Sequence, residues 1–335
     1  TSPSSASSGI KSPRSSREQT GQALSPAAKS ATVPGAESCA EPCRDIVTIS
    51  SFSQRAVKIN LLLKPAATGD CPRYQLMSKK KIGLALSGGG ARGFAHVGVL
   101  KVLEQHGVKF DMIAGTSAGS FVGGALAAGM SAAEIEAMAR KVRWLNTLRP
   151  SFPLRGLLST APMGKFLAGG LPFTRIEDLP TPFAAVAYDL VSGEEVVLQG
   201  NGDLVQAIRA SCTVPGIFSP IKDAAGRILV DGGVTSVLPL DVIRKMGADV
   251  IIAVDLIACG GVFRHKPRNV LSITVRSALA LIRTASGSQA TKADLVIEPA
   301  IAHLRPDQIG KLDEFIALGE SAARSRIDEI LALTQ

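Results

Sequence analysis

KIGLALSGGGARG (residues 81–93) carries the clearest indication of fold class in the sequence. Its apolar first half is typical of a buried strand, three glycines follow, and residues 91–105 then carry apolar side chains at helical spacing. FDMIAG (110–115) has the pattern of a second strand. A strand, a glycine-rich turn, a helix and another strand in this order predict the start of an α/β fold.

The same alternation continues toward the C-terminus. We expect further strands within 182–190, 194–199, 227–233, 249–256 and 293–299, and helices near 117–129, 203–211, 239–246, 269–284 and 308–333. Strands that alternate with helices predict a three-layer α/β/α arrangement, with a mostly parallel central sheet and helices on both faces. No internal repeat is visible.

Composition favours one large domain. Hydrophobic residues make up 46% of the 335 residues and aromatic residues only 4%, as expected for an interior built from Ala, Val, Leu and Ile. The formal net charge of +9 lies mostly in residues 1–80, which hold 11 Lys and Arg against 5 Asp and Glu. The remainder is nearly balanced and has no basic stripe with interleaved aromatic residues, so we expect no nucleic-acid partner.

The first 76 residues differ from the rest. Residues 1–45 are rich in Ser, Ala, Pro and Gly, a composition that cannot bury enough apolar surface to offset chain entropy. MSKKKIGLAL, which begins at Met77, has the form of a protein start followed by a buried strand. We expect residues 1–76 to be a disordered or appended extension, either an added segment or an ordinary flexible arm, and residues 77–335 to form the folded domain.

The sequence gives no sign of secretion or of a membrane span. Asp255 interrupts the most apolar window, which is therefore shorter than the roughly 18 residues of a spanning helix. The N-terminus lacks the apolar region of a secretory signal. Of the five cysteines, three lie in the extension and two lie far apart in the domain, so neither a disulfide framework nor a metal site is indicated. We expect a cytoplasmic protein.

The glycine-rich loop is suited to holding an anion. Gly88, Gly89 and Gly90 allow a tight turn with bare N–H groups, and the helix that follows adds a partial positive charge at its N-terminus. The spacing of Gly88, Gly90 and Gly93 also matches a dinucleotide-binding fingerprint. That alternative requires an acidic residue at the end of the second strand, whereas Asp111 precedes this strand.

A second motif, Gly115-x-Ser117-x-Gly119, also lies between a strand and a small-residue helix. In a nucleophile elbow the two glycines allow strand and helix to approach closely, and the sharp turn presents the serine hydroxyl to a substrate carbonyl. An ordinary turn with an N-capping serine has the same pattern. The anion-holding loop about 25 residues earlier favours the elbow, so we expect Ser117 to be a nucleophile.

A serine nucleophile needs a base, and Asp231 is the preferred candidate. It ends an apolar strand and is followed by Gly232 and Gly233. Catalytic groups of α/β sheets gather at the carboxyl ends of strands, which would bring Asp231 close to Ser117 if the two strands are near neighbours. An Asp that caps a turn before two glycines is the alternative.

A histidine base is the other possibility. We expect His96 and His106 to be packing or surface residues of the first helix, while His265 lies in a basic loop. His303, in a polar connection late in the chain, is the best candidate for an ordinary triad.

Taken together, SGGGARG, GTSAG and DGG resemble the glycine-rich loop, nucleophile elbow and aspartate motif of patatin-like phospholipases, specifically the small bacterial members related to the neuropathy target esterase catalytic domain. Residues 187–193 and 209–218 resemble the family's segment before the catalytic aspartate. The resemblance covers about residues 82–257. It implies a patatin-like fold, with Ser117 as nucleophile, Asp231 as general base and N–H groups around Gly88, Gly89 and Gly90 as the oxyanion hole. Arg92, beside Gly93, is expected to stiffen the loop or to bind a substrate phosphate.

The resemblance implies an acyl hydrolase of lipid esters that needs no cofactor or metal. Apolar residues within 144–173, among them Trp144, Phe166 and Phe173, are candidate walls for an acyl chain, either as a mobile flap or as a helical part of the core. We also expect peripheral contact with a membrane. Hydrolysis of soluble esters or thioesters, acyl transfer, and an idle regulator that binds lipid or protein are the alternatives.

Overall fold

The computed structural model describes residues 79–143, 149–151, 158–260 and 292–334, with isolated positions between 266 and 280. One mixed sheet organises this part of the chain. The strand order is β10-β9-β1-β2-β5-β8-β7, and β6 pairs with β5 as well. The strands are β1 (Ile82–Leu86), β2 (Met112–Thr116), β5 (Phe183–Asp189), β6 (Glu194–Gln199), β7 (Ile221–Lys222), β8 (Ile228–Asp231), β9 (Val250–Val254) and β10 (Leu295–Ile297). A separate short hairpin joins β3 (Arg149–Pro150) and β4 (Leu158–Ser159).

Strand direction changes across the sheet. Strands β10, β9, β1, β2 and β5 are parallel neighbours, whereas β6 and β8 run antiparallel to β5, and β7 runs antiparallel to β8. Both antiparallel hairpins have short connections with a glycine in the left-handed region, Gly193 with φ 74° and Gly226 with φ 84°. A connection this short can join only antiparallel strands.

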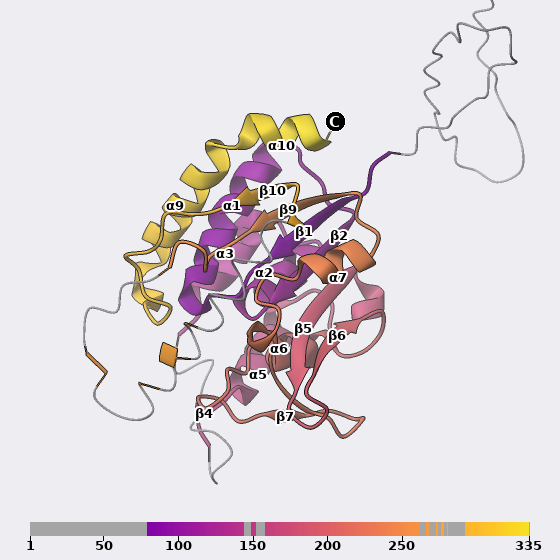
Figure 1. The fold of residues 1–335 in the computed structure, drawn as a ribbon, viewed down its shortest axis with the longest axis vertical. Coiled ribbons are helices and arrows are strands. Elements are labelled where there is room, and N and C mark those ends of the chain that lie inside the picture. The colour runs from indigo at the N-terminus through magenta and orange to yellow at the C-terminus, as the bar shows by residue number, and fades with distance from the viewer. Residues whose placement is uncertain are drawn as a thin grey trace, which may run out of the picture. The chain divides into compact units, whose positions relative to one another are not determined.

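Helices cover both faces of the sheet. They are α1 (Phe94–Gln105), α2 (Ala118–Ala127), α3 (Ala132–Arg140), α5 (Ala161–Gly170), α6 (Leu204–Ser211), α7 (Leu240–Lys245), α9 (Leu312–Arg324) and α10 (Ile327–Thr334). Successive strand residues point to opposite faces, so Leu84 joins a core with α1, α2 and α9, while Ala85 joins a core with α7. Figure 1 shows α1 and α9 on one side of the parallel strands and α7 on the other.

Helix α9 packs directly on α1, which carries the glycine-rich loop at its start. A Cβ added to Gly98 would lie 2.0 Å from the carbonyl oxygen of Ile316, and one added to Gly319 would lie 2.0 Å from that of Ala95. The two backbones therefore touch, and only glycine fits at either position. Helix α9 is thus part of the same core as α1.

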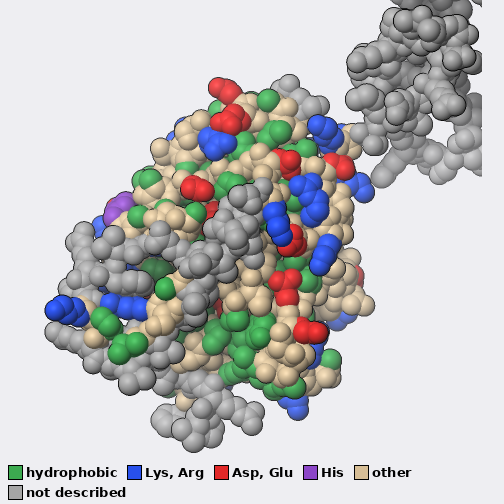
Figure 2. Space-filling model, in the orientation of Figure 1, with side chains coloured by type: hydrophobic (Ala, Val, Ile, Leu, Met, Phe, Trp, Pro, Cys, Tyr) green, Lys and Arg blue, Asp and Glu red, His purple; other side chains and the backbone are tan. Residues whose placement is uncertain are grey.

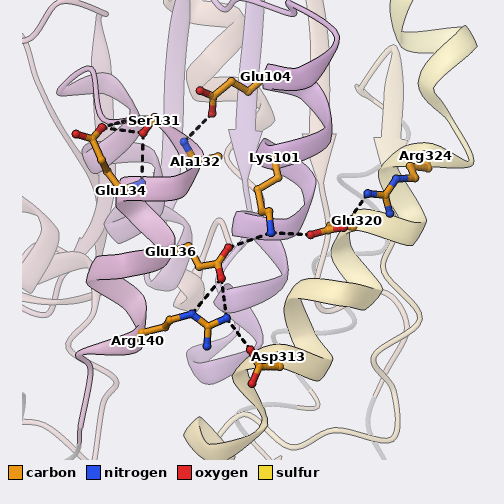
Figure 3. A network of polar contacts seen from close by, with 10 residues as sticks. All are labelled: Lys101, Glu104, Ser131, Ala132, Glu134, Glu136, Arg140, Asp313, Glu320 and Arg324. Carbon is orange, nitrogen blue, oxygen red and sulfur yellow. Dashed lines mark hydrogen bonds and ion pairs between the residues drawn. The ribbon is translucent and has the colours of Figure 1, made fainter.

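Ion pairs extend this contact at the surface of the helices (Figure 3). The Lys101 ammonium of α1 lies 3.0 Å from Glu136 of α3 and 2.9 Å from Glu320 of α9. Arg140 bridges Glu136 and Asp313, again joining α3 to α9. Exposed pairs contribute little individually, but this set connects three helices that are distant in sequence.

The α/β class and the mostly parallel sheet are confirmed. All five later strands lie within their predicted ranges, although the antiparallel direction of β6 and β8 was not predicted. The helix expected at 308–333 is two helices, α9 and α10, which separate near Arg326, where this side chain donates to the Val296 carbonyl. The predictions for residues 1–76 and for a helix at 269–284 lie outside the described residues.

Candidate active site

The sheet register brings Ser117 and Asp231 together. Strand β6 occupies one edge of β5 from residue 184 to residue 189, so β2 and β8 share the other edge. On that edge β2 ends with Thr116 opposite Val186, and β8 arrives from the other direction and ends with Asp231 opposite Ala187. The two strands therefore meet end to end, rather than side by side as neighbouring parallel strands would. Ser117 follows Thr116 directly, so it lies at this junction.

Ser117 has the backbone of a nucleophile elbow. Its φ of 53° makes it the one non-glycine residue with positive φ among the described residues. A Cβ on Gly115 would lie 2.3 Å from the Gly119 carbonyl oxygen, and one on Gly119 would lie 2.2 Å from that of Leu86. Side chains at these two glycines would separate β2, α2 and β1, which explains the G-x-S-x-G spacing.

Asp231 is a buried carboxyl group whose pKa responds to the nearby Ser117 hydroxyl. Its side chain is 6% exposed, and Oδ1 accepts a hydrogen bond from the Gly233 N–H at 2.8 Å. Burial raises the pKa of Asp231 to about 6, while hydrogen bonds from the Ser117 hydroxyl and the Gly233 N–H oppose this rise. Such a carboxylate is ionised at neutral pH and is basic enough to accept a proton from a nearby hydroxyl.

The glycine-rich loop packs beside the elbow. A Cβ on Gly88 would lie 3.2 Å from Cβ of Ser117, and one on Gly93 would lie 2.6 Å from Cβ of Ala118. The N–H of Gly88 is donated to the Val237 carbonyl at 3.0 Å, so it is already used within the protein.

The next two N–H groups of the loop differ from that of Gly88. In the described part of the chain, those of Gly89 and Gly90 have no hydrogen-bond acceptor. Gly90 has φ 59°, and its added Cβ would lie 2.7 Å from the Pro306 carbonyl oxygen. Of the three N–H groups expected as donors, that of Gly88 is already bonded within the protein, whereas those of Gly89 and Gly90 are not bonded within the described residues.

Arg92 supports the glycine-rich loop from its buried side. Its side chain is 4% exposed and donates to the Leu304 carbonyl from Nε at 3.0 Å and from Nη2 at 2.9 Å, and to the Leu256 carbonyl from Nη1 at 3.2 Å. A guanidinium that is buried against main-chain carbonyls fits loop support rather than phosphate binding.

None of the three described histidines hydrogen-bonds to Ser117 or Asp231. His96 is fully buried; its Nε2 bonds the Ser87 carbonyl at 2.8 Å, and burial lowers its pKa to about 4. His106 bonds the Val102 carbonyl, and His303 pairs with Glu314 in an exposed position. The fourth, His265, lies outside the described residues.

The backbone N–H groups of Ser117 and Asp231 donate hydrogen bonds to the segment that ends helix α6, for which the sequence predicts no role. The Ser117 N–H donates to Oγ of Ser211 at 2.8 Å, and the Asp231 N–H donates to the Thr213 carbonyl at 2.8 Å. Ser211 and Thr213 belong to residues 209–218. This stretch resembles the family's segment before the catalytic aspartate, but the sequence predicts no role for these two residues. No residue pattern indicated this pairing, because it depends on where the end of α6 lies in space.

The proposed acyl-binding stretch is only partly described, since Trp144, Leu148, Phe152, Leu154 and Leu157 lie outside the described residues. The described remainder of residues 144–173 includes helix α5, so part of this stretch is helical. Phe166 of α5 stacks on Phe121, one helical turn after Ser117, with ring centroids 6.4 Å apart and planes 20° apart. Phe173 is half-buried.

Neither a nucleotide site nor a metal site is evident in the described residues. The Asp111 carboxylate accepts the Ile82 N–H at 2.7 Å and so caps the start of β1 instead of facing a ribose. No group of three or more His, Cys, Asp or Glu residues that could hold a metal ion occurs in these parts of the chain.

Residues 84–243 match the family model described as patatin-like phospholipase. An uncharacterized NTE family protein of Mycobacterium tuberculosis is 39% identical over 187 residues, which cover 55% of this chain and 51% of that protein. Patatin-like phospholipase domain-containing protein 6 of Homo sapiens is 35% identical over 191 residues, covering 54% of this chain and 14% of that protein. The chain thus spans about half of the mycobacterial relative and a smaller part of the human one.

Solved structures are more distant. VipD from Legionella pneumophila has a TM-score of 0.47 and 14% identity, covering 75% of this chain and 67% of that chain. Human GIVD cytosolic phospholipase A2 has a TM-score of 0.42 and 11% identity, covering 79% of this chain and 60% of that chain.

Proposed function

Because residues 84–243 match the family model of patatin-like phospholipases, we propose that the protein is a serine hydrolase of acyl esters that acts on lipid esters with a Ser117–Asp231 dyad. The observation that carries this proposal is the end-to-end meeting of β2 and β8 on β5, which brings the Ser117 hydroxyl close enough to the buried Asp231 carboxyl group to lower the pKa of that group. A nucleophile beside a base is the minimum that acyl transfer to an enzyme requires.

The reaction proceeds in two halves. Asp231 takes the hydroxyl proton as Ser117 Oγ attacks the ester carbonyl, and the same proton then goes to the departing alkoxide, which leaves as the alcohol. The acyl group remains on Ser117. A water molecule, deprotonated by Asp231, attacks this acyl-enzyme; release of the carboxylic acid returns the proton to Ser117.

The N–H groups of Gly89 and Gly90 are the proposed donors to the oxyanion of each tetrahedral intermediate. Both lie in a loop packed on the elbow, and neither has an acceptor within the described residues. Removal of one such donor typically costs about 10²- to 10³-fold in rate. Arg92 and His96 support the loop from its buried side and take no part in the chemistry.

Lipid rather than soluble substrates are favoured by the family and by the apolar surroundings of the site. Phe121 follows Ser117 by one helical turn, and its stack with Phe166 of α5 is the proposed apolar wall for an acyl chain. Large exposed hydrophobic side chains follow the strands of the site, with Val234 just after β8 and with Leu190 and Val191 at the tip of the β5–β6 hairpin.

We further propose that contact with lipid is peripheral. No helix among the described residues is long and apolar enough to cross a bilayer. On the face drawn in Figure 2, acidic and basic side chains are interspersed, and hydrophobic side chains gather in the lower half. Interspersed charges of both signs lack the concentrated positive charge that binding of a polyanion requires.

The test is a substrate panel with a matched pair of variants. Wild type, Ser117→Ala and the exposed α9 variant Ser321→Ala are assayed on nitrophenyl esters of increasing chain length and on phospholipid vesicles. We expect wild type and Ser321→Ala to cleave long-chain and phospholipid esters, Ser117→Ala to lose turnover, and a fluorophosphonate to label only proteins that retain Ser117.

Each alternative has its own outcome in this panel. A wild type that the fluorophosphonate does not label would indicate an idle lipid- or protein-binding regulator. Turnover restricted to short esters or thioesters would indicate soluble substrates, and product formation that depends on an added alcohol acceptor would indicate an acyltransferase.

A further inference from the structure

The segment that follows helix α6 touches both residues of the proposed dyad. Ser211, the last residue of α6, accepts the Ser117 N–H on its Oγ at 2.8 Å. Two residues later the Thr213 carbonyl accepts the Asp231 N–H at 2.8 Å. Ser211 and Thr213 are both fully buried. One short stretch of chain therefore holds the backbones of nucleophile and base, which come from different strands.

The Ser117 N–H needs this acceptor because of where it lies. Ser117 is the N-cap of α2 and has left the ladder of β2, so neither the helix nor the sheet supplies a main-chain acceptor for its amide. Its φ of 53° is a conformation that serine adopts only where the surroundings enforce it. The hydroxyl of Ser211 satisfies the amide in that conformation.

The hydroxyl itself is firmly placed. The N–H of Cys212 continues the helical bonding of α6 to the Ile208 carbonyl at 3.0 Å, and Oγ1 of Thr213 donates to the Arg209 carbonyl at 2.7 Å. Nε of Arg209 in turn donates to the Thr160 carbonyl at 3.2 Å. The end of α6 is thereby fixed on both sides of Ser211.

We infer that Ser211 is a positioning residue, which holds the Ser117 elbow in register with Asp231 through the Ser117 amide. This inference rests on the proposed function. Ser211 touches neither the Asp231 carboxylate nor the Ser117 hydroxyl in any hydrogen bond of the described residues, so it carries no proton in the reaction. Its effect is to keep the Ser117 hydroxyl within reach of the base.

Ser211→Ala tests the role, because it removes the acceptor and little else. Displacement of a reacting group by about 1 Å can cost about 10²-fold in rate. We expect kcat on a soluble ester to fall about 10- to 100-fold, with KM changed less than about twofold, and fluorophosphonate labelling of Ser117 to slow in parallel. The Ser117 hydroxyl lowers the pKa of Asp231. If Ser211→Ala moves this hydroxyl away from Asp231, the pKa of Asp231 should rise, and the acidic limb of the kcat/KM profile should move to higher pH.

Two further variants complete the test. Ser211→Thr keeps an oxygen at the position and should recover part of the rate. Ser219, in the same connection after α6, has one side-chain hydrogen bond among the described residues, to Ser151 Oγ, so Ser219→Ala should behave as wild type. Thermal unfolding is followed for each variant so that rates are compared on folded protein.

The outcomes separate this inference from the proposed function. Wild-type turnover that disappears in Ser117→Ala tests the function, whereas the ratio of Ser211→Ala to wild type tests only the positioning role. A folded Ser211→Ala enzyme with normal kcat would overturn the inference. So would a reduced kcat with an unmoved acidic limb, because that result indicates a loss of rigidity without a change at Asp231.

Discussion

Burial of Asp231 sets the pH range in which the proposed base is active. The carboxyl group is 6% exposed, and burial raises its pKa from an ordinary value of 3.8 to about 6. Only the ionised form can accept the Ser117 proton. Below pH 6 the protonated fraction grows, so the rate should fall about tenfold for each further pH unit.

The measurement is kcat/KM on a soluble nitrophenyl ester between pH 4.5 and pH 8, which reports the free enzyme. We expect an acidic limb with a midpoint near the pKa of about 6. A limb that persists unchanged in a variant without His303 would agree with an aspartate base. A flat profile down to pH 4.5 would show that no carboxylate or histidine titrates in the reaction.

The same burial has a thermodynamic consequence. A carboxyl group with a raised pKa in the folded state favours folding most when it is protonated, and that contribution is lost as pH rises from about 4 through about 6. The difference between 3.8 and about 6 corresponds to about 3 kcal/mol. Asp231 therefore destabilises the fold at neutral pH, as expected for a group retained for its chemistry.

The glycine-rich loop depends on segments that come much later in the chain, 164 residues after Arg92 at Leu256 and 212 residues after it at Leu304. Ala91 donates its N–H to the Pro306 carbonyl at 2.7 Å, and Arg92 donates to the carbonyls of Leu304 and Leu256. The family match ends at residue 243. Residues beyond that match thus form part of the support for the proposed oxyanion donors.

Arg92→Lys tests this support. Lysine keeps the charge but cannot donate to both carbonyls in the geometry of a guanidinium, so the loop should lose its fixed position. We expect kcat to fall about tenfold or more while KM stays nearly constant, since loop placement matters most when the oxyanion forms. The matched control is Arg305→Lys, an exposed arginine of the same segment that pairs with Asp307.

The comparison should be made well below the melting temperature of both variants. Wild-type kcat in a folded Arg92→Lys protein would show that the loop is held without the guanidinium.

The sequence predicted the positions of the strands better than it predicted whether they run parallel or antiparallel. The strand that ends in Asp231 was recognised from its apolar run and the two glycines after it, because period and turn residues are local properties. Its antiparallel course is set by pairing with the far half of β5, which no local pattern encodes. Ser117 and Asp231 were expected to be close as neighbours at one end of a parallel sheet; they meet instead because two strands approach from opposite directions.

For the molecule as a whole, sequence motifs predicted the loop, the elbow and the aspartate of the candidate site but not the contacts that hold them in the structure. Gly115 and Gly119 could be predicted because a nucleophile elbow requires glycine at fixed spacing. The role of Ser211 could not, since it depends on a side chain from α6 that lies 94 residues from its partner. The contact of α9 with α1 through Gly98 and Gly319 was likewise not predictable, because neither glycine belongs to a motif.

In the proposed mechanism Asp231, and no histidine, is the base for Ser117. The most direct measurement is turnover of one soluble ester by Asp231→Asn and by His303→Gln, each checked for folding by thermal unfolding. Asparagine preserves the shape of the side chain but cannot accept the proton, so Asp231→Asn should lose about 10²- to 10⁴-fold in kcat. His303→Gln should stay near wild type, because this ring bonds only Glu314 in the described structure. The reverse pattern, with His303→Gln inactive and Asp231→Asn nearly normal, would contradict the dyad and leave Asp231 as a residue that caps a turn.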